Sequence, residues 1–87
     1  MEQNEFKLSG ATVRVARLLK GVSATEFAKN VGLSLNHFTQ LEREVAGITF
    51  RNHFRILREL RKLGYTDQQL AAILILTENI EGVEVKR

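Results

Sequence analysis

The 87-residue sequence contains no cysteine, no proline and no hydrophobic run long enough to span a bilayer. Without cysteine, the chain lacks a disulfide framework, a zinc-thiolate site and a thiol nucleophile. Its longest aliphatic run covers residues 70–76, and its acidic start, residues 1–5, lacks the basic-then-apolar order of a secretion signal. We therefore expect a protein of the cytoplasm that has no membrane contact.

With proline absent, glycine is the main helix breaker, and glycines at 10, 21, 32, 47, 64 and 82 divide the chain into segments of helical length. Hydrophobic residues make up 44% of the chain and charged residues 26%, close to the globular average. We predict an all-α, compact five-helix domain over residues 1–80, followed by a flexible tail over 81–87. The predicted helices cover about 11–20, 24–30, 35–44, 50–63 and 67–78.

Polar residues suited to capping stand before four of these helices. Ser23 with Glu26, and Thr66 with Gln69, have the spacing of a capping box, in which two side chains satisfy each other's free backbone amides. Ser34 and Thr49 are suited to cap the helices that follow them. In the helix over 50–63, the stripe expected to face the core is Phe50, Phe54, Leu57, Leu60 and Leu63.

Positive charge is concentrated in the middle of the chain. Thirteen basic and ten acidic residues give a net charge of +3, but residues 14–62 hold ten basic and four acidic residues, and residues 65–84 hold only acidic ones. This asymmetry indicates that the basic part faces a polyanion. Solvated helix faces with no partner would explain the same charges.

Residues 24–44 have the spacing of a helix-turn-helix, two short helices joined by a tight turn. Ala28 stands where the two helices approach most closely, and Gly32 supplies the positive φ angle of the turn. Ser34 caps the second helix. The apolar residues that fix the crossing angle are Phe27, Val31, Leu33, Phe38 and Leu41.

On these residues the chain resembles the lambda-repressor-like, or xenobiotic-response-element, family of helix-turn-helix domains. The resemblance covers roughly residues 8–64: Gly21-Val22-Ser23 is similar to the family's Gly-Leu-Ser, Glu26-Phe27-Ala28 to Glu-Leu-Ala, Gly32-Leu33-Ser34 to Gly-Val-Ser, and Phe38 to Arg43 to Ile-Ser-x-Ile-Glu-Arg. It implies four or five helices, with the third helix placed in the major groove of operator DNA by a dimer.

The sequence also differs from the family at four places. Ala24 replaces a phosphate-contacting glutamine, Leu35 replaces a polar base-reading residue, and Glu44 replaces a glycine. The following loop, residues 45–47, has no basic residue. These differences alter the expected DNA contacts and leave the predicted fold unchanged.

In this geometry the start and outer face of the helix over 35–44 would read bases, through Leu35, Asn36, Thr39 and Gln40. Helix starts and nearby cations would bind phosphate, through Ser23, Thr25, Arg43, Arg51, Asn52 and Arg55. An ordinary solvated helix face is the alternative for both sets. The resemblance also implies a structural, partly buried pair between Arg17 and Glu42.

The helix over 67–78 is apolar nearly all round, so one small domain cannot bury every side of it. We predict a homodimer interface formed by Leu70, Ile73, Leu74, Ile75 and Leu76. In the alternative, Leu70, Ile73, Leu74 and Thr77 pack on the core of the monomer.

Catalysis has little support in the sequence. The two histidines, His37 and His53, have no second ligand at metal spacing, and no phosphate-binding glycine loop is present. We predict a non-enzyme without cofactor, metal or small-molecule ligand. The expected function is a sequence-specific DNA-binding transcriptional regulator, a repressor of the phage or mobile-element type, associated with the nucleoid. The alternative is a protein-interaction module, such as an antitoxin or anti-repressor subunit, that grips a second regulatory protein.

Overall fold

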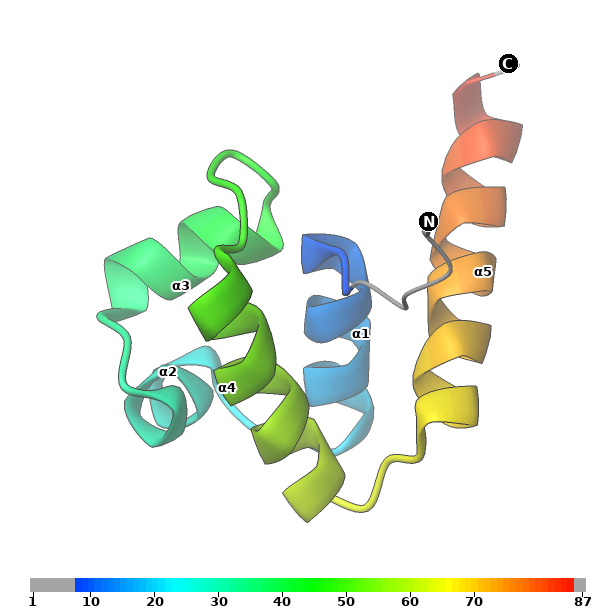
Figure 1. Cartoon of the computed structure of the whole chain (residues 1–87). Coiled ribbons are helices and arrows are strands. Elements are labelled where there is room, and N and C mark those ends of the chain that lie inside the picture. Colours follow the sequence, from blue (N-terminus) through cyan, green and yellow to red (C-terminus); the bar gives the residue numbers. More distant parts are fainter. Residues whose placement is uncertain (1–7, 86–87) are drawn as a thin grey trace.

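The computed structural model describes the backbone of residues 8–85 and the side chains of residues 8–78. Within that range it is all-α, without strands, and contains α1 (Gly10–Leu19), α2 (Ala24–Val31), α3 (Leu35–Glu42), α4 (Phe50–Lys62) and α5 (Asp67–Val85) (Figure 1). The five predicted helices are therefore confirmed. Helix α5 continues to Val85, past its predicted end at residue 78, so the tail expected over 81–87 is helical as far as the structure describes it.

The predicted caps form in the structure, but only one of the two predicted capping boxes is complete: among the described residues no hydrogen bond returns from the Glu26 side chain to the Ser23 amide. The hydroxyls of Ser23, Ser34 and Thr49 each accept a hydrogen bond from the backbone amide three residues further on, at 3.0–3.2 Å. Thr66 and Gln69 form the complete capping box, because each side chain accepts from the backbone amide of the other. These caps satisfy amides that the first turn of a helix leaves free.

A tight turn fixes α2 against α3. Gly32 has φ 78°, in the left-handed region that an L side chain rarely adopts, and the Leu33 amide donates back to the Ala28 carbonyl at 2.9 Å. The rings of Phe27 and Phe38 stack across the two helices with centroids 5.2 Å apart, and both side chains are fully buried. The turn and the aromatic pair together set the crossing of α2 and α3.

Helix α1 lies at the centre of the fold and contacts α3, α4 and α5, while α4 also packs on α2 (Figure 1). The core contains Val13 and Ala16 of α1 together with side chains from each of the other helices. Tyr65, in the link between α4 and α5, donates a hydrogen bond from its hydroxyl to the Ala16 carbonyl at 2.8 Å. This bond joins the start of α5 to α1.

The predicted inward stripe of α4 is confirmed in part. Leu60 is fully buried, and Leu57 and Leu63 are partly buried against the core. The assignment of Phe50 and Phe54 to that stripe is wrong. The residues that α4 buries are Asn52, Ile56 and Leu60, whereas Phe50 is 72% exposed and Phe54 54% exposed. Apolar residues occur at helical spacing on two faces of α4, and the face of Ile56 and Leu60 is the one that meets α1 and α2. The two phenylalanine rings instead pack edge-on against each other at the surface, with centroids 4.8 Å apart.

The ion pair implied between Arg17 and Glu42 is present and buried. Arg17 Nε donates to Glu42 Oε2 at 2.8 Å and Arg17 Nη2 donates to Glu42 Oε1 at 3.0 Å, so the contact is bidentate. The third guanidinium nitrogen, Nη1, donates to the Val22 carbonyl at 2.8 Å. One arginine therefore joins α1, the segment that precedes α2, and the end of α3.

A second junction holds the start of α1 against the end of α3. A Cβ atom added to Gly10 would lie 2.0 Å from the Leu41 carbonyl oxygen, so only glycine allows this approach. Glu44 has φ 62°, and its carboxylate accepts from the Ala11 amide at 3.0 Å in the first turn of α1. The glutamate thus adopts the left-handed conformation that suits glycine, and its side chain caps α1.

Removing the buried arginine tests the ion pair between Arg17 and Glu42. We expect Arg17→Ala to lower the free energy of unfolding by roughly 3–5 kcal/mol, because it leaves the Glu42 carboxylate buried without its partner. Arg61 is the matched control, since it pairs with Asp67 at 2.8 Å on an exposed surface. Arg61→Ala should cost less than about 1 kcal/mol. Equal losses in urea denaturation followed by circular dichroism would refute the structural role of Arg17.

Two phenylalanine-to-alanine substitutions, one in the core and one at the surface of α4, test which ring is buried. Phe38→Ala should lower the free energy of unfolding by about 3–5 kcal/mol, because it opens a cavity in the core. Phe54→Ala should change it by roughly 0.5 kcal/mol or less, because that ring is largely exposed. The same denaturation measurement applies, and a comparable loss from both variants would show that the Phe54 ring is buried.

Candidate nucleic-acid interface

The outer face of α3 carries polar side chains opposite a buried face. Phe38 and Leu41 point into the core, and Asn36, Gln40 and Arg43, at spacings of four and three residues, share the opposite side. Asn36 and Arg43 are exposed and Gln40 is half-buried. The structure therefore brings two amide side chains and one guanidinium onto a single surface, where they can meet a partner.

Two of the predicted base-reading residues lie at the edge of this surface. Leu35, the first residue of α3, is 44% exposed. Thr39 is half-buried, and its hydroxyl donates to the Asn36 carbonyl at 2.9 Å within the same helix. The proton of Thr39 is therefore already used, and its oxygen remains available as an acceptor.

The N-terminus of α2 lies open, with Ser23 and Thr25 both exposed. Free amides and the helix dipole make such an end attractive to anions, although the Ser23 oxygen is occupied as the cap and Glu26 adds a negative charge to the first turn. Asn52 differs from its prediction. It is buried on the inward side of α4, whereas Arg43 and Arg51, which were predicted with it to contact phosphate, are exposed.

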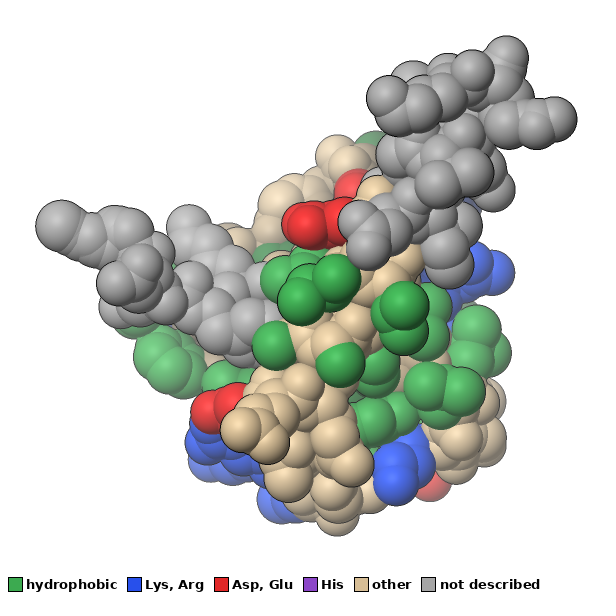
Figure 2. Space-filling model, turned by 90° about the vertical axis from the view of Figure 1, so that its right-hand side faces the viewer, with side chains coloured by type: hydrophobic (Ala, Val, Ile, Leu, Met, Phe, Trp, Pro, Cys, Tyr) green, Lys and Arg blue, Asp and Glu red, His purple; other side chains and the backbone are tan. Residues whose placement is uncertain are grey.

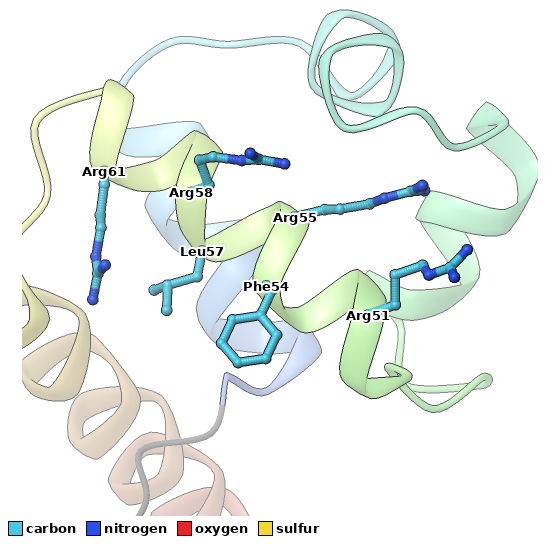
Figure 3. Close-up of a pocket in the computed structure, with 6 residues that line it drawn as sticks. All are labelled: Arg51, Phe54, Arg55, Leu57, Arg58 and Arg61. Atoms are coloured by element: carbon cyan, nitrogen blue, oxygen red, sulfur yellow. The ribbon is translucent and has the colours of Figure 1, made fainter.

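The exposed surface of α4 has a basic side and an apolar side. Figure 3 shows Arg51, Arg55 and Arg58 extending away from Phe54, Leu57 and Arg61, toward the part of the molecule that contains α2 and α3. Lys62 continues the basic row by helical spacing. Only Arg51 and Arg55 of this row were predicted from the sequence to contact phosphate. The repeat of basic residues at 51, 55, 58 and 62 was the signal that could have extended the set.

Helix α5 divides its apolar residues between the core and the surface. Leu70 and Ile73 are buried inside the monomer, so their assignment to a dimer interface is wrong. Their position follows from helical spacing, because residues three apart lie on the same side of α5, the side that faces α1. Leu74 is half-buried, and Ile75 and Leu76 are 56% and 59% exposed. Figure 2 shows hydrophobic side chains gathered at the surface on the side of the molecule that carries α5.

No group of three His, Asp or Glu side chains among the described residues is placed to hold a metal ion. Burial raises the pKa of the Tyr65 phenol above its ordinary value, which extends toward higher pH the range in which its hydroxyl donates to the Ala16 carbonyl. No helix within residues 8–85 combines the length and hydropathy needed to cross a membrane.

No protein-family model matches the chain, and no curated protein or solved structure matches it.

Proposed function

We propose that the protein is a sequence-specific DNA-binding transcriptional regulator, most simply a repressor, whose α3 enters the major groove of double-stranded DNA. The observation that carries this proposal is the outer face of α3. A short helix held by three buried residues carries Asn36, Gln40 and Arg43 on its outer face, next to the basic row of α4. The motifs that resemble lambda-repressor-like domains support the same function.

Recognition would proceed in steps that use different parts of the surface. The basic residues capture the polyanion, and phosphate contacts from the start of α2 and from Arg51 and Arg55 then fix the orientation of the protein on the duplex. The amides of Asn36 and Gln40 suit adenine, because each can donate and accept one hydrogen bond in the major groove. A good contact of this kind contributes about 1–3 kcal/mol of discrimination.

A homodimer would give the regulator a two-fold operator. Ile75 and Leu76 leave apolar surface exposed on α5, and a second copy is the simplest partner for such a surface. The longest dimension of the molecule is 36 Å. Half-sites on successive turns of DNA lie roughly 34–36 Å apart, so each copy of such a dimer would bind one half-site.

A protein-interaction module is the second candidate function. The specific observation in its favour is the exposure of the Phe50 and Phe54 rings on α4, at 72% and 54%, in addition to Ile75 and Leu76 of α5. Such surfaces are typical of sites that bind another protein. In this case the paired helices α2 and α3 would serve as a scaffold.

Selection from a random duplex library at physiological salt tests the first proposal. We expect enrichment of an inverted repeat. Gln40→Ala should then weaken binding to the selected sequence by about 5- to 150-fold, which corresponds to the 1–3 kcal/mol of one base contact, and should relax the preference at one base pair. The control is Gln68→Ala, an exposed glutamine of α5. No enrichment, or equal behaviour of the two variants, would favour the interaction module.

Charge insertion on α5 tests the dimer. Ile75→Glu and Leu76→Glu should each give a folded monomer near 9.9 kDa in light scattering, where the parent protein has twice that mass. DNA binding should weaken at the same time, because the two half-sites are no longer linked. Gln68→Glu adds the same charge on an already polar residue of α5 and should remain dimeric. An oligomeric mass that is the same for the parent and all three variants would refute this interface.

A further inference from the structure

A basic hollow lies between the C-terminal end of α2 and the second half of α4. Its volume is about 310 Å³, and backbone and side chains of α2 and of the glycine turn form one wall. The four cations that line it are Lys29 from α2 and Arg55, Arg58 and Lys62 from α4. Because two helices contribute, the cluster exists only once α2 and α4 have packed together.

The turn between α2 and α3 makes room for one of these arginines. The Nη1 atom of Arg55 lies 3.7 Å from the position that a Cβ atom on Gly32 would occupy. The Arg55 side chain thus reaches across the hollow to the turn. A Cβ atom at that position would be in ordinary van der Waals contact with the guanidinium, so a larger residue at position 32 would be opposed by the backbone strain at φ 78° and not by Arg55.

Among the residues that the structure describes, four cations and one carboxylate line the hollow, so its positive charge is only partly balanced. Its single carboxylate, Glu59, accepts a hydrogen bond from the Asn30 amide at 3.2 Å. Outside the hollow, Arg17 pairs with Glu42 and Arg61 pairs with Asp67. None of the four cations of the hollow forms an ion pair with another described side chain. Cations held together in this way repel one another, and an anion with several charges would relieve that repulsion.

The shape of the cluster favours an extended polyanion. Arg55 and Lys62 are seven positions apart in α4, which corresponds to a distance of about 10 Å along the helix axis. Over that length duplex DNA carries roughly six phosphate charges, counting both strands. A row of phosphates therefore matches the row of cations better than a single anion does.

We propose that the hollow formed by Lys29, Arg55, Arg58 and Lys62 is a second phosphate-binding site that holds the DNA backbone outside the bases read by α3. This inference rests on the proposed DNA-binding function and extends it. The site adds affinity that does not depend on sequence, and it lies beside the turn that positions α3. Lys29, Arg58 and Lys62 are then phosphate contacts additional to those that the sequence analysis selected.

The test is the double variant Arg58→Gln with Lys62→Gln, and its control is Arg61→Gln. Arg61 belongs to the same helix, but it does not line the hollow: its side chain points away from that of Arg58 and pairs with Asp67. Binding to the selected operator and to a random duplex is measured over a range of salt concentrations. We expect both affinities to fall by the same factor and the slope of log K against log salt to decrease by about 2, while the preferred sequence stays unchanged.

Three other outcomes would overturn the proposal. In the first, the parent protein binds operator DNA, and the double variant has the same affinities and the same salt slope as Arg61→Gln. This result would refute the second site and leave the proposed function standing. A parent protein that binds no duplex refutes the proposed function itself, and the backbone contact with it. Calorimetry with tripolyphosphate separates the two sources of phosphate: binding tighter than that of duplex DNA, and lost in the double variant, would assign the hollow to a free polyphosphate instead.

Discussion

The buried contact between Arg17 and Glu42 is the constraint on which the arrangement of the first three helices depends. Its two carboxylate bonds and the third bond to the Val22 carbonyl use one guanidinium to hold α1, the segment before α2, and the end of α3. The charges lie inside a small core, where each would be costly without the other. The orientation of the exposed face of α3 follows from how this pair anchors its C-terminal end.

The close approach of Gly10 to the Leu41 carbonyl reinforces that anchor from the other end of α1. Glu44 completes it, since its carboxylate caps α1 while its backbone takes the left-handed conformation. Both ends of α1 are therefore tied to α3. A rigid α3 is what a base-reading helix requires, because hydrogen bonds to base edges depend on position and angle.

The two exposed faces of helix α4 belong to two different surfaces, a basic one proposed to contact DNA and an apolar one suited to a protein partner. Ile56 and Leu60 hold it in the core, the arginines at 51, 55 and 58 lie toward α2 and α3, and Phe54 lies on the other side. The basic side continues the surface proposed to meet DNA. The aromatic side, together with the exposed part of α5, leaves the protein an apolar surface that is independent of it.

Local signals in the sequence predicted the helices well. The caps at Ser23, Ser34 and Thr49 and the left-handed Gly32 depend only on neighbours in the chain, so their spacing was enough. Helix α4 was placed correctly and Leu60 was rightly assigned to its buried side, but Phe50 and Phe54 were assigned there in place of Ile56, because their spacing continues the same apolar pattern. Which stripe is buried depends on the packing of α4 against α1 and α2, and that packing is not local.

The candidate site shows the same limit. Asn36 and Gln40 could be selected from helical spacing, but the burial of Asn52 depends on how α4 sits in the fold. The use of the Thr39 hydroxyl within α3 was equally invisible to the spacing argument. The basic hollow is formed by residues of α2 and α4 that are far apart in the chain, so no local sequence motif predicts it.

The most direct test of the central claim, that α3 meets duplex DNA, is a titration of the ¹⁵N-labelled protein with a duplex that carries the selected sequence. Amide signals are followed by heteronuclear NMR. The account requires the largest shifts at residues 35–43, with further shifts at the start of α2 and along the basic side of α4. Shifts confined to α5 and the aromatic side of α4, or no shifts at all, would contradict it.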